Sequence, residues 1–403
     1  MSDTTITLDA ASYAASNRGY WQRNLWICVF GSFTTLVSLT LLLPFLPLYV
    51  EQLGVHGDAA VIGWSGVAFG ATFLGTGLTA PLWGALGDRY GRKAMLVRAA
   101  LGMAIVMPLI GCAHNVWQLV ALRLAAGLIG GYASSSIMLI ATQAPKDKSG
   151  WALGILSTGS LAGTLIGPLI GGTLPGLIGI RHTFFATGSV IAVAAVLTML
   201  FVREERAPRR VTVSAVPSAK LPYAALALMF GTAMLVLFAN MSIEPIITVY
   251  LRDLHVPAVR LVFDAGLIMA ASALGSIAMA APLGRLADRI GPHRVIAACL
   301  AAAGLILLPQ ALVQTWWQLA LLRFLLGGAL AGLLPAVAKV IRQSVPESAL
   351  GKVLGYSQSA QYAGQVLGPL AGGALGGLLG MRAVFLGTGL LMLAGAWLNR
   401  QRG

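Results

Sequence analysis

Charged residues are scarce in this sequence: they make up 10% of its 403 residues, whereas hydrophobic residues make up 57%. Soluble domains carry roughly 25% charged residues, so this scarcity disfavours a soluble fold. Apolar runs recur between short polar breaks, and they reach the roughly 20 residues that a helix needs to cross a hydrocarbon layer of about 30 Å. They are too long for barrel strands and lack the strict alternation of apolar and polar residues. The sequence therefore predicts an all-α membrane protein.

Cysteine, histidine and catalytic motifs are equally sparse. The three cysteines, Cys28, Cys112 and Cys299, fall in three different predicted helices without the paired spacing of metal or redox sites, so we expect them to fill the core. Histidines fall in loops or at helix ends, which gives a metal cluster no support. No GxxxxGK[ST] motif and no nucleophile–base constellation is visible, so ATP-driven pumping and enzymatic activity are disfavoured. We expect neither a cofactor nor a metal.

Acidic residues are also few, 13 against 27 lysines and arginines, which gives a formal net charge of +14. An excess of this size is also found in nucleic-acid-binding proteins, which carry it as a compact patch or as a stripe along one helix. Instead, most of it falls in the tails and loops on one side of the predicted membrane domain: Arg18, Arg23, Arg89, Arg92, Lys93, Lys146, Lys148, Arg203, Arg206, Arg209, Arg210, Lys220, Arg285, Arg289, Arg294, Arg400 and Arg402. The opposite side holds Arg181, Arg252, Arg260 and Arg382. This bias follows the positive-inside rule, so we expect both termini in the cytoplasm and no nucleic-acid partner.

Polar breaks divide the chain into twelve predicted transmembrane helices. They span residues 24–50, 60–82, 94–113, 117–142, 151–175, 183–202, 223–250, 262–283, 295–313, 317–342, 352–376 and 383–399. Residues 1–20 lack the apolar core of a cleavable signal, and we expect a disordered cytoplasmic tail there. Residues 203–222 are charged and contain proline, as a cytoplasmic linker would. The expected domains are thus two six-helix bundles, residues 21–202 and 223–403.

The second half of the chain repeats the first at an offset of 200 to 201 residues. The matching segments are GALGDRYGRK with GRLADRIGPHR, WQLVALRLAAG with WQLALLRFLLG, and GTLIGPLIGG with GQVLGPLAGG, which begin at Gly84, Gly284, Trp117, Trp317, Gly163 and Gly364. Because six helices separate equivalent points, the halves share one topology and are related by an axis along the membrane normal. We therefore expect two pseudo-symmetric six-helix bundles that rock about a central site.

These segments resemble the major facilitator superfamily over essentially the whole chain beyond residue 20. GALGDRYGRK is similar to that superfamily's loop signature between helices 2 and 3, and Arg123 with Gly127 is similar to its helix 4 signature. GTLIGPLIGG resembles the helix 5 signature of twelve-helix drug:proton antiporters, while LPFLPLYVEQLG and ATQAPKDKSGWALG resemble a bacterial multidrug-resistance branch. The resemblance implies a major facilitator fold and proton-coupled export of drug-like compounds by alternating access.

The loop predicted at 84–93 suggests a charge latch on the cytoplasmic face. Its glycines permit a tight turn where two helices approach, and its aspartate can accept bonds from backbone donors at a helix start or from nearby arginines. Breaking such a latch shifts the conformational equilibrium rather than removing a binding pocket. A merely solvated turn is the alternative. The predicted gating residues here are Gly84, Asp88, Arg89, Gly91 and Arg92, with Asp288 and Arg289 in the second copy.

Glycines recur every four residues around Pro168 in the helix predicted at 151–175. Such a smooth face lets another helix pack closely, which alone suffices to explain the pattern. The resemblance to antiporters implies a further role, in which this face seals against the opposite half and prevents leak during exchange. On that reading Gly163, Gly167 and Pro168 are gating residues too.

Glu244 is the one carboxylate deep in an apolar run, ANMSIEPIITVY. Its neighbour Pro245 removes a backbone hydrogen bond and can open the helix locally. A carboxyl group in a low dielectric holds a proton more readily than one in water, so Glu244 can exchange a proton between the two sides and attract a cationic compound when ionised. An acid satisfied by a helix partner is the alternative. Arg123 is the second predicted proton-coupling residue, with a structural role between helices as its alternative.

Polar and aromatic side chains predict the wall of a central cavity. Three glutamines follow i, i+3, i+7 spacing, so they share one helix face that should not meet lipid. Two tyrosines offer contacts to planar or amphipathic compounds, although aromatic residues near helix ends also anchor a protein at the membrane interface. The predicted substrate site consists of Glu244, Asn240, Tyr49, Tyr250, Gln358, Gln361 and Gln365.

The sequence thus predicts a monomeric exporter in a bacterial inner membrane, with small molecules and protons as its ligands and the lipid bilayer around it. An exporter of sugars or other small metabolites is the alternative, and it would need a more hydrogen-bonding cavity than these glutamines and tyrosines provide. A non-transporting membrane sensor or scaffold is a third reading, which the duplicated gating loops disfavour.

Overall fold

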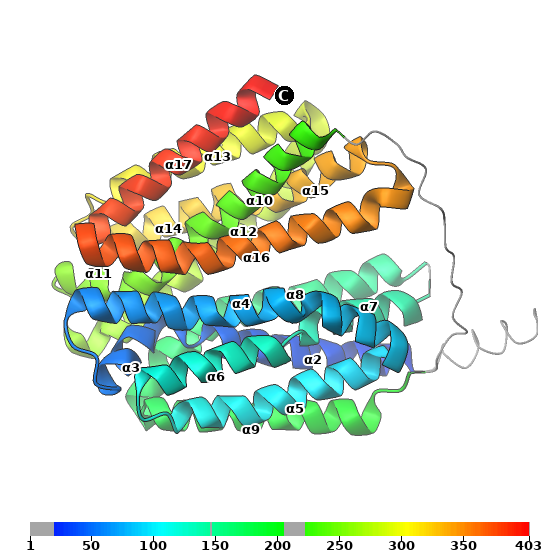
Figure 1. Cartoon of the computed structure of the whole chain (residues 1–403), viewed down its shortest axis with the longest axis horizontal. Coiled ribbons are helices and arrows are strands. Elements are labelled where there is room, and N and C mark those ends of the chain that lie inside the picture. Colours follow the sequence, from blue (N-terminus) through cyan, green and yellow to red (C-terminus); the bar gives the residue numbers. More distant parts are fainter. Residues whose placement is uncertain (1–19, 146, 205–221, 403) are drawn as a thin grey trace, which may run out of the picture.

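A computed structural model describes residues 20–145, 147–204 and 222–402. Within these ranges the regular elements are all helical. Figure 1 shows them as two neighbouring bundles, one built from the first half of the chain and one from the second. The tail predicted at 1–20 lies outside the described residues except for its last residue, and so does most of the linker predicted at 203–222.

The first half of the chain forms six membrane-length segments, two of which are interrupted. A 3-10 turn separates α2 from α3, and a short break separates α6 from α7. The elements are α2 (Trp21–Thr40), η1 (Leu43–Phe45), α3 (Leu46–Gln52), α4 (Asp58–Tyr90), α5 (Arg92–Gly111), α6 (Val116–Ile129), α7 (Tyr132–Gln143), α8 (Ser149–Ile178) and α9 (Ile180–Phe201).

The second half repeats this pattern, interruptions included. A 3-10 turn separates α10 from α11, and Gly332 separates α14 from α15. The elements are α10 (Tyr223–Ile243), η2 (Glu244–Ile246), α11 (Ile247–Asp253), α12 (Ala258–Ile290), α13 (Pro292–Gln310), α14 (Trp316–Ala331), α15 (Leu333–Ser344), α16 (Glu347–Leu379) and α17 (Met381–Arg402).

In the described part of the chain, eleven segments are long and apolar enough to cross a membrane. The remaining segment of the second bundle, α16, has 33 residues and packs against α10 and against α4 of the first half. With α16 the two bundles supply the twelve helices that the sequence predicts, and the expected all-α membrane fold is confirmed.

Proline and glycine explain where the helices break. Pro44 and Pro245 have no backbone N–H, so the helical hydrogen-bond ladder cannot continue through them, and both lie in 3-10 turns. Gly131, between α6 and α7, has a φ of +106°, and Gly91, between α4 and α5, has a φ of +99°. Residues with a Cβ rarely adopt this conformation, so glycine is needed both at the break within the α6–α7 segment and at the reversal between α4 and α5.

The signature at 84–93 is mostly helical, and the prediction of a loop there is wrong. α4 continues to Tyr90 and α5 begins at Arg92, so the connection is Gly91 alone. A glycine inside a helix costs only about 1 kcal/mol relative to alanine, which a long packed helix tolerates, so Gly84 does not end α4. The chain reverses at Gly91 because of its positive φ.

The two ends of the assembly differ in how closely the halves approach. We call the end that holds Glu204 and Pro222 the linker end, and the end that holds the turns at 53–57 and 254–257 the loop end. Figure 1 shows α4 and α16 running close together at the loop end and diverging toward the linker end. The two halves also meet through α8 and α12.

Glycines mark the contact between the halves. A Cβ added to Gly66 would meet the Pro369 carbonyl oxygen, and one added to Gly266 would meet that of Pro168, so backbones touch across the halves in the part nearer the loop end. At the linker end six glycines stand in open space, with nothing within 4 Å of an added Cβ: Gly84, Gly150, Gly154, Gly284, Gly351 and Gly355. The halves are therefore closed on each other at the loop end and apart at the linker end.

Candidate functional site

The two 3-10 turns meet where the two halves are in contact. η1 contacts η2, and η2 also contacts α4 of the first half. The Thr248 hydroxyl, which follows η2, donates to the Pro44 carbonyl oxygen in η1 at 2.7 Å. Glu244 is the first residue of η2. The acid singled out from the sequence therefore lies where the two bundles come together.

Glu244 has two polar partners in its own half. The Asn240 amide donates to a Glu244 carboxylate oxygen at 2.7 Å, from one turn earlier along α10. Arg323, from the middle of α14, attracts the carboxylate electrostatically. The Glu244 side chain is partly buried. The predicted substrate residues Asn240 and Glu244 are thus adjacent, and Glu244 has the kind of helix partner that its alternative reading required.

Arg123 and Arg323, which are equivalent residues in the fourth membrane-length segment of each half, are fully buried, but their surroundings differ. Arg123 and Arg323 are each 1% exposed. Arg123 Nε lies 3.4 Å from the Ala68 carbonyl oxygen, and its guanidinium carbon lies 5.5 Å from the centre of the Phe69 ring. Within the described residues, the Arg123 Nη2 atom and the Arg323 Nε and Nη1 atoms have no hydrogen-bond partner. Each arginine therefore keeps free donors in a buried environment, which is costly unless another state supplies an acceptor.

The three glutamines of α16 share a helix face that lies between the face packed on α10 and the face packed on α4. Gly364 packs against Met234 of α10, and Tyr362 packs against Gly77 of α4 across the halves. With 3.6 residues per turn, the face of the glutamines falls between those two directions and away from the side that carries exposed Leu367. The predicted cavity residues Gln358, Gln361 and Gln365 thus point between the bundles, and all three are at least partly exposed.

The two predicted substrate tyrosines are buried inside their own halves. Tyr49 is 1% exposed and its hydroxyl donates to the Ile110 carbonyl oxygen in α5. Tyr250 is 0% exposed and its hydroxyl donates to the Gln310 carbonyl oxygen at 3.0 Å. Neither ring is available to a compound or to the membrane interface in this conformation. Each instead fixes the end of a broken helix to its neighbour, so the placement expected from the sequence is wrong.

The helix 5 glycines face both halves: Gly163 and Gly167 pack on their own half, whereas Gly172 packs on α12 of the opposite half. A Cβ on Gly163 would meet Phe33, and one on Gly167 would meet Thr40, both in α2 of the same half. Pro168 alone of the three predicted residues approaches the opposite half, through its carbonyl oxygen and Gly266. The four-residue glycine spacing lets α8 lie close to α2, as the packing explanation expected.

The linker-end signature of the first half is held together by local charges. Asp88 forms an ion pair with Arg92, one turn later. Glu204 accepts the backbone N–H groups of Arg92 and Lys93 at 2.9 and 2.7 Å, at the start of α5 where helix donors are free. The sequence predicts the arginine partner of Asp88 but misses Glu204, because nothing in the spacing of residues 92 and 204 shows that they are neighbours.

The second copy of the signature uses a different partner. Lys339 Nζ in α15 lies 2.6 Å from the Asp288 carboxylate. Arg89 and Arg289 are exposed at the same end of the molecule. Both ion pairs lie within one half, so they do not form a latch across the halves in this conformation, where the linker ends are apart.

A contact between the halves at the loop end was missed from the sequence. Arg252, near the end of α11, donates to both carboxylate oxygens of Glu51 in α3, and its Nη2 lies 2.7 Å from Oε2. Asp58, at the start of α4, lies 3.6 Å from the same guanidinium. The signal was available, because Glu51 and Arg252 are 201 residues apart, the offset of the repeat itself.

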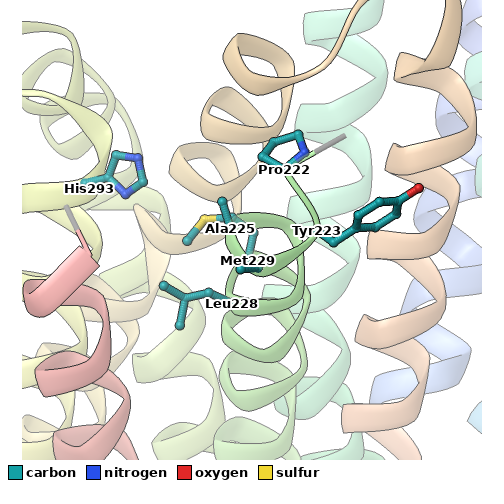
Figure 2. Close-up of a pocket in the computed structure, with 7 residues that line it drawn as sticks. Pro222, Tyr223, Ala225, Leu228, Met229 and His293 are labelled. Atoms are coloured by element: carbon teal, nitrogen blue, oxygen red, sulfur yellow. The ribbon is translucent and has the colours of Figure 1, made fainter. Parts of the chain in front are cut away.

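One cavity lies at the linker end of α10, away from Glu244. It has a volume of about 470 Å³ and is mostly apolar. Figure 2 shows His293 on one side of it and the first turns of α10 on the other, with the Tyr223 ring pointing away from His293. It is lined by Pro222, Tyr223, Ala224, Ala225, Leu228, Met229 and His293. None of these belongs to the predicted substrate site.

Two of the three cysteines fill the core as expected. Cys28 and Cys299 are buried, whereas Cys112 is exposed at the end of α5, so its prediction is wrong. Among the described residues, no group of three or more histidine, cysteine, aspartate or glutamate side chains is placed to hold a metal ion.

Comparison with known proteins agrees with the fold. The sequence model of the Major Facilitator Superfamily matches residues 28–263 and 228–401. Multidrug resistance protein MdtG of Enterobacter lignolyticus is 47% identical over 325 residues, which cover 79% of this chain and 77% of the relative. MdtG of Salmonella paratyphi C is 48% identical over 326 residues, which cover 79% of this chain and 80% of the relative.

Solved structures share the architecture at low sequence identity. A bacterial homologue of the human lysosomal transporter Spinster aligns with a TM-score of 0.76 at 16% identity, covering 95% of this chain and 97% of that one. The human organic anion transporter MFSD10 aligns with a TM-score of 0.68 at 19% identity, covering 94% of this chain and 99% of that one. Likenesses at this identity establish the arrangement of the twelve helices.

Proposed function

The chain belongs to the major facilitator superfamily and is a multi-pass membrane transporter rather than an enzyme, and from this premise we propose that it exports small amphipathic compounds in exchange for protons. The name of its relatives, multidrug resistance protein, supports drug-like compounds as the substrates. The proposed setting is a bacterial inner membrane, with both termini in the cytoplasm and a monomer as the working unit. The positive-inside bias of the sequence supports that orientation.

One observation carries the proton coupling: a partly buried carboxyl group, Glu244, lies where the two halves meet and is attracted by a buried arginine, Arg323. When Glu244 is ionised, this attraction and the Asn240 hydrogen bond hold it in place. When it takes up a proton, Arg323 loses its counter-charge. The two protonation states therefore favour different arrangements of η2 and α14, which is the coupling that exchange needs.

The conformation fits the first step of export. With the linker ends apart, the glutamine face of α16 is accessible from the side that the charge bias assigns to the cytoplasm. A cationic amphipathic compound enters there and displaces the proton from Glu244, because its positive charge and the proton compete for the same carboxylate. Closing the linker end then brings the exposed Asp88 and Asp288 toward the opposite half, where the predicted latch would form.

The energy of one proton per cycle is sufficient. A membrane potential of about 100 mV supplies about 2.3 kcal/mol for each charge moved. For an uncharged compound, that free energy sustains roughly a fortyfold concentration gradient before any pH difference contributes. One-for-one exchange of a singly charged cation for a proton moves no net charge, so the pH difference alone drives it.

The test is a Glu244→Gln variant reconstituted in proteoliposomes with an imposed proton gradient. We expect it to insert normally and to equilibrate a cationic dye down its concentration gradient, but to lose uphill transport, because the amide cannot exchange a proton. Asp253→Asn is the matched control, since Asp253 is an exposed acid in the adjoining α11. Normal proton-driven accumulation by Glu244→Gln would contradict the proposal, and transport of sugars but not of cationic dyes by the parent protein would favour the metabolite exporter.

A further inference from the structure

The loop-end contact between Glu51, Arg252 and Asp58, which we call the loop-end triad, joins the two halves of the molecule. Arg252 belongs to α11 of the second half, whereas Glu51 and Asp58 belong to α3 and α4 of the first. The guanidinium donates two parallel hydrogen bonds to the Glu51 carboxylate. A carboxylate oxygen of Asp58 lies 3.6 Å from the Nη1 atom of the same guanidinium. Such two-pronged pairs are stronger and more directional than a single ionic contact.

The pseudo-symmetry of the chain explains why the charges meet at this place. Glu51 and Arg252 are equivalent positions of the two copies, 201 residues apart. Equivalent residues that touch must lie beside the axis relating the halves, and two identical charges there would repel each other. The sequence has a glutamate in one copy and an arginine in the other. This divergence turns a contact that an exact repeat would make repulsive into an attractive one.

The second acid of the triad is also present in one copy only. α4 begins at Asp58, whereas α12 of the second half begins at Ala258. Side-chain exposure is 32% for Arg252, 31% for Glu51 and 63% for Asp58. Glu51 is therefore the main partner, and Asp58 adds a weaker, more screened attraction.

We propose that the loop-end triad is the gate that holds the loop end closed while the linker end is open. The neighbouring contacts across the halves at this end are backbone packing at glycines and the hydrogen bond from Thr248 to Pro44, which carry no net charge. Asp253 of α11 repels Asp58 electrostatically, so among the described residues it is Arg252 that supplies the charge attraction between the halves here. Separating the halves at the loop end requires Arg252 to leave both carboxylates. The strength of the triad thus sets the equilibrium between the two conformations, independently of which proton or compound the central site binds.

The experiment measures that equilibrium directly. Spin labels on Gln52→Cys and Val259→Cys, both exposed and in opposite halves at the loop end, are introduced into the full-length protein with Cys28, Cys112 and Cys299 replaced by serine. Pulsed electron spin resonance then gives the distance distribution across the gate. In an Arg252→Gln variant we expect the long-distance population to rise about fivefold, the effect of losing roughly 1 kcal/mol of attraction. Glu51→Gln should act in the same direction.

Charge exchange separates a gate from general damage to the fold. Glu51→Arg alone places two arginines beside the axis and should open the gate further than Arg252→Gln does. The double variant Glu51→Arg with Arg252→Glu restores an attractive pair and should return the distribution to that of the parent. Arg181→Gln, which removes an exposed arginine at the same end, is the matched control and should leave the distances unchanged. Unchanged distances in both Arg252→Gln and Glu51→Gln, or no recovery in the double variant, would overturn the proposal.

Discussion

The two halves of the molecule place the same buried arginine in different electrostatic surroundings. In the second half, Arg323 is attracted by Glu244, the first residue of η2. In the first half, the position equivalent to Glu244 is Leu43, which is buried, and among the described residues the Arg123 guanidinium contacts the Ala68 carbonyl oxygen and the Phe69 ring. The duplication has kept the helices and the arginines in both copies but has kept a titratable partner in only one.

A symmetric scaffold with this one asymmetry can couple to a proton. An acid in both copies would place two carboxylates close to the axis, where they would repel each other when ionised. With a single acid, one proton changes the charge balance of one half only. The same one-sided distribution recurs at the loop end, where Glu51 faces Arg252.

The largest expected effect comes from removing the arginine that has a counter-charge. Arg323→Gln removes the electrostatic attraction of Glu244 while its Asn240 hydrogen bond remains, and we expect it to lower the free energy of unfolding by roughly 2 kcal/mol. Combining it with Glu244→Gln should recover at least half of that loss. Thermal unfolding of the purified proteins in detergent measures both changes.

The matched comparison is Arg123→Gln in the first half. Since no carboxylate loses a partner there, we expect a smaller loss of about 1 kcal/mol, and Glu244→Gln should not recover it. Equal losses for the two arginines, or recovery of Arg123→Gln by Glu244→Gln, would contradict the asymmetry between the halves.

An intermediate effect is expected when the missing acid is supplied to the first half. Leu43→Glu places a carboxyl group at the position equivalent to Glu244, where the free Nη2 atom of Arg123 can receive it. We expect Leu43→Glu to lower the free energy of unfolding. The loss should be about 1 kcal/mol smaller when Arg123 is present than in an Arg123→Gln background. A double-mutant cycle on unfolding gives this coupling energy. A coupling of zero would show that the two positions are not related as Glu244 and Arg323 are.

The smallest effects are expected at the paired tyrosines. Tyr49→Phe and Tyr250→Phe each remove one hydrogen bond to a carbonyl oxygen of the same half. We expect each change to cost about 0.5 to 1 kcal/mol of stability and to leave the range of exported compounds unchanged. If either variant conferred resistance to a narrower range of compounds, that tyrosine would belong to the substrate site.

Hydropathy, the repeat and single prolines were sufficient to predict most of the fold. The twelve helices, the duplication and the local opening beside Pro245 all follow from properties of short segments. The end of α4 was misplaced because polarity marks where the membrane ends, whereas a helix ends where a residue such as Gly91 changes its backbone conformation. The break at Gly131 was missed for the same reason, since one glycine in an apolar run has no distinctive hydropathy.

Side-chain direction was the part that the sequence could not supply. Glu244 and Asn240 were predicted together because they are one helical turn apart, and the three glutamines share a face for the same reason. Tyr49 and Gly163, by contrast, could face either their own half or the other, and only the packing of α3 on α5 and of α8 on α2 decides between these directions. Contacts between distant segments, such as Glu204 with the start of α5, were equally out of reach.

The most direct measurement of proton coupling follows the proton itself. When a cationic compound is added to the purified transporter in weakly buffered detergent solution, we expect the protein to release protons to the solution, because the compound displaces the proton from Glu244. Glu244→Gln should bind the compound more weakly and release none, whereas Asp253→Asn should behave like the parent. Proton release of equal size from Glu244→Gln would contradict the assignment of Glu244 as the coupling acid.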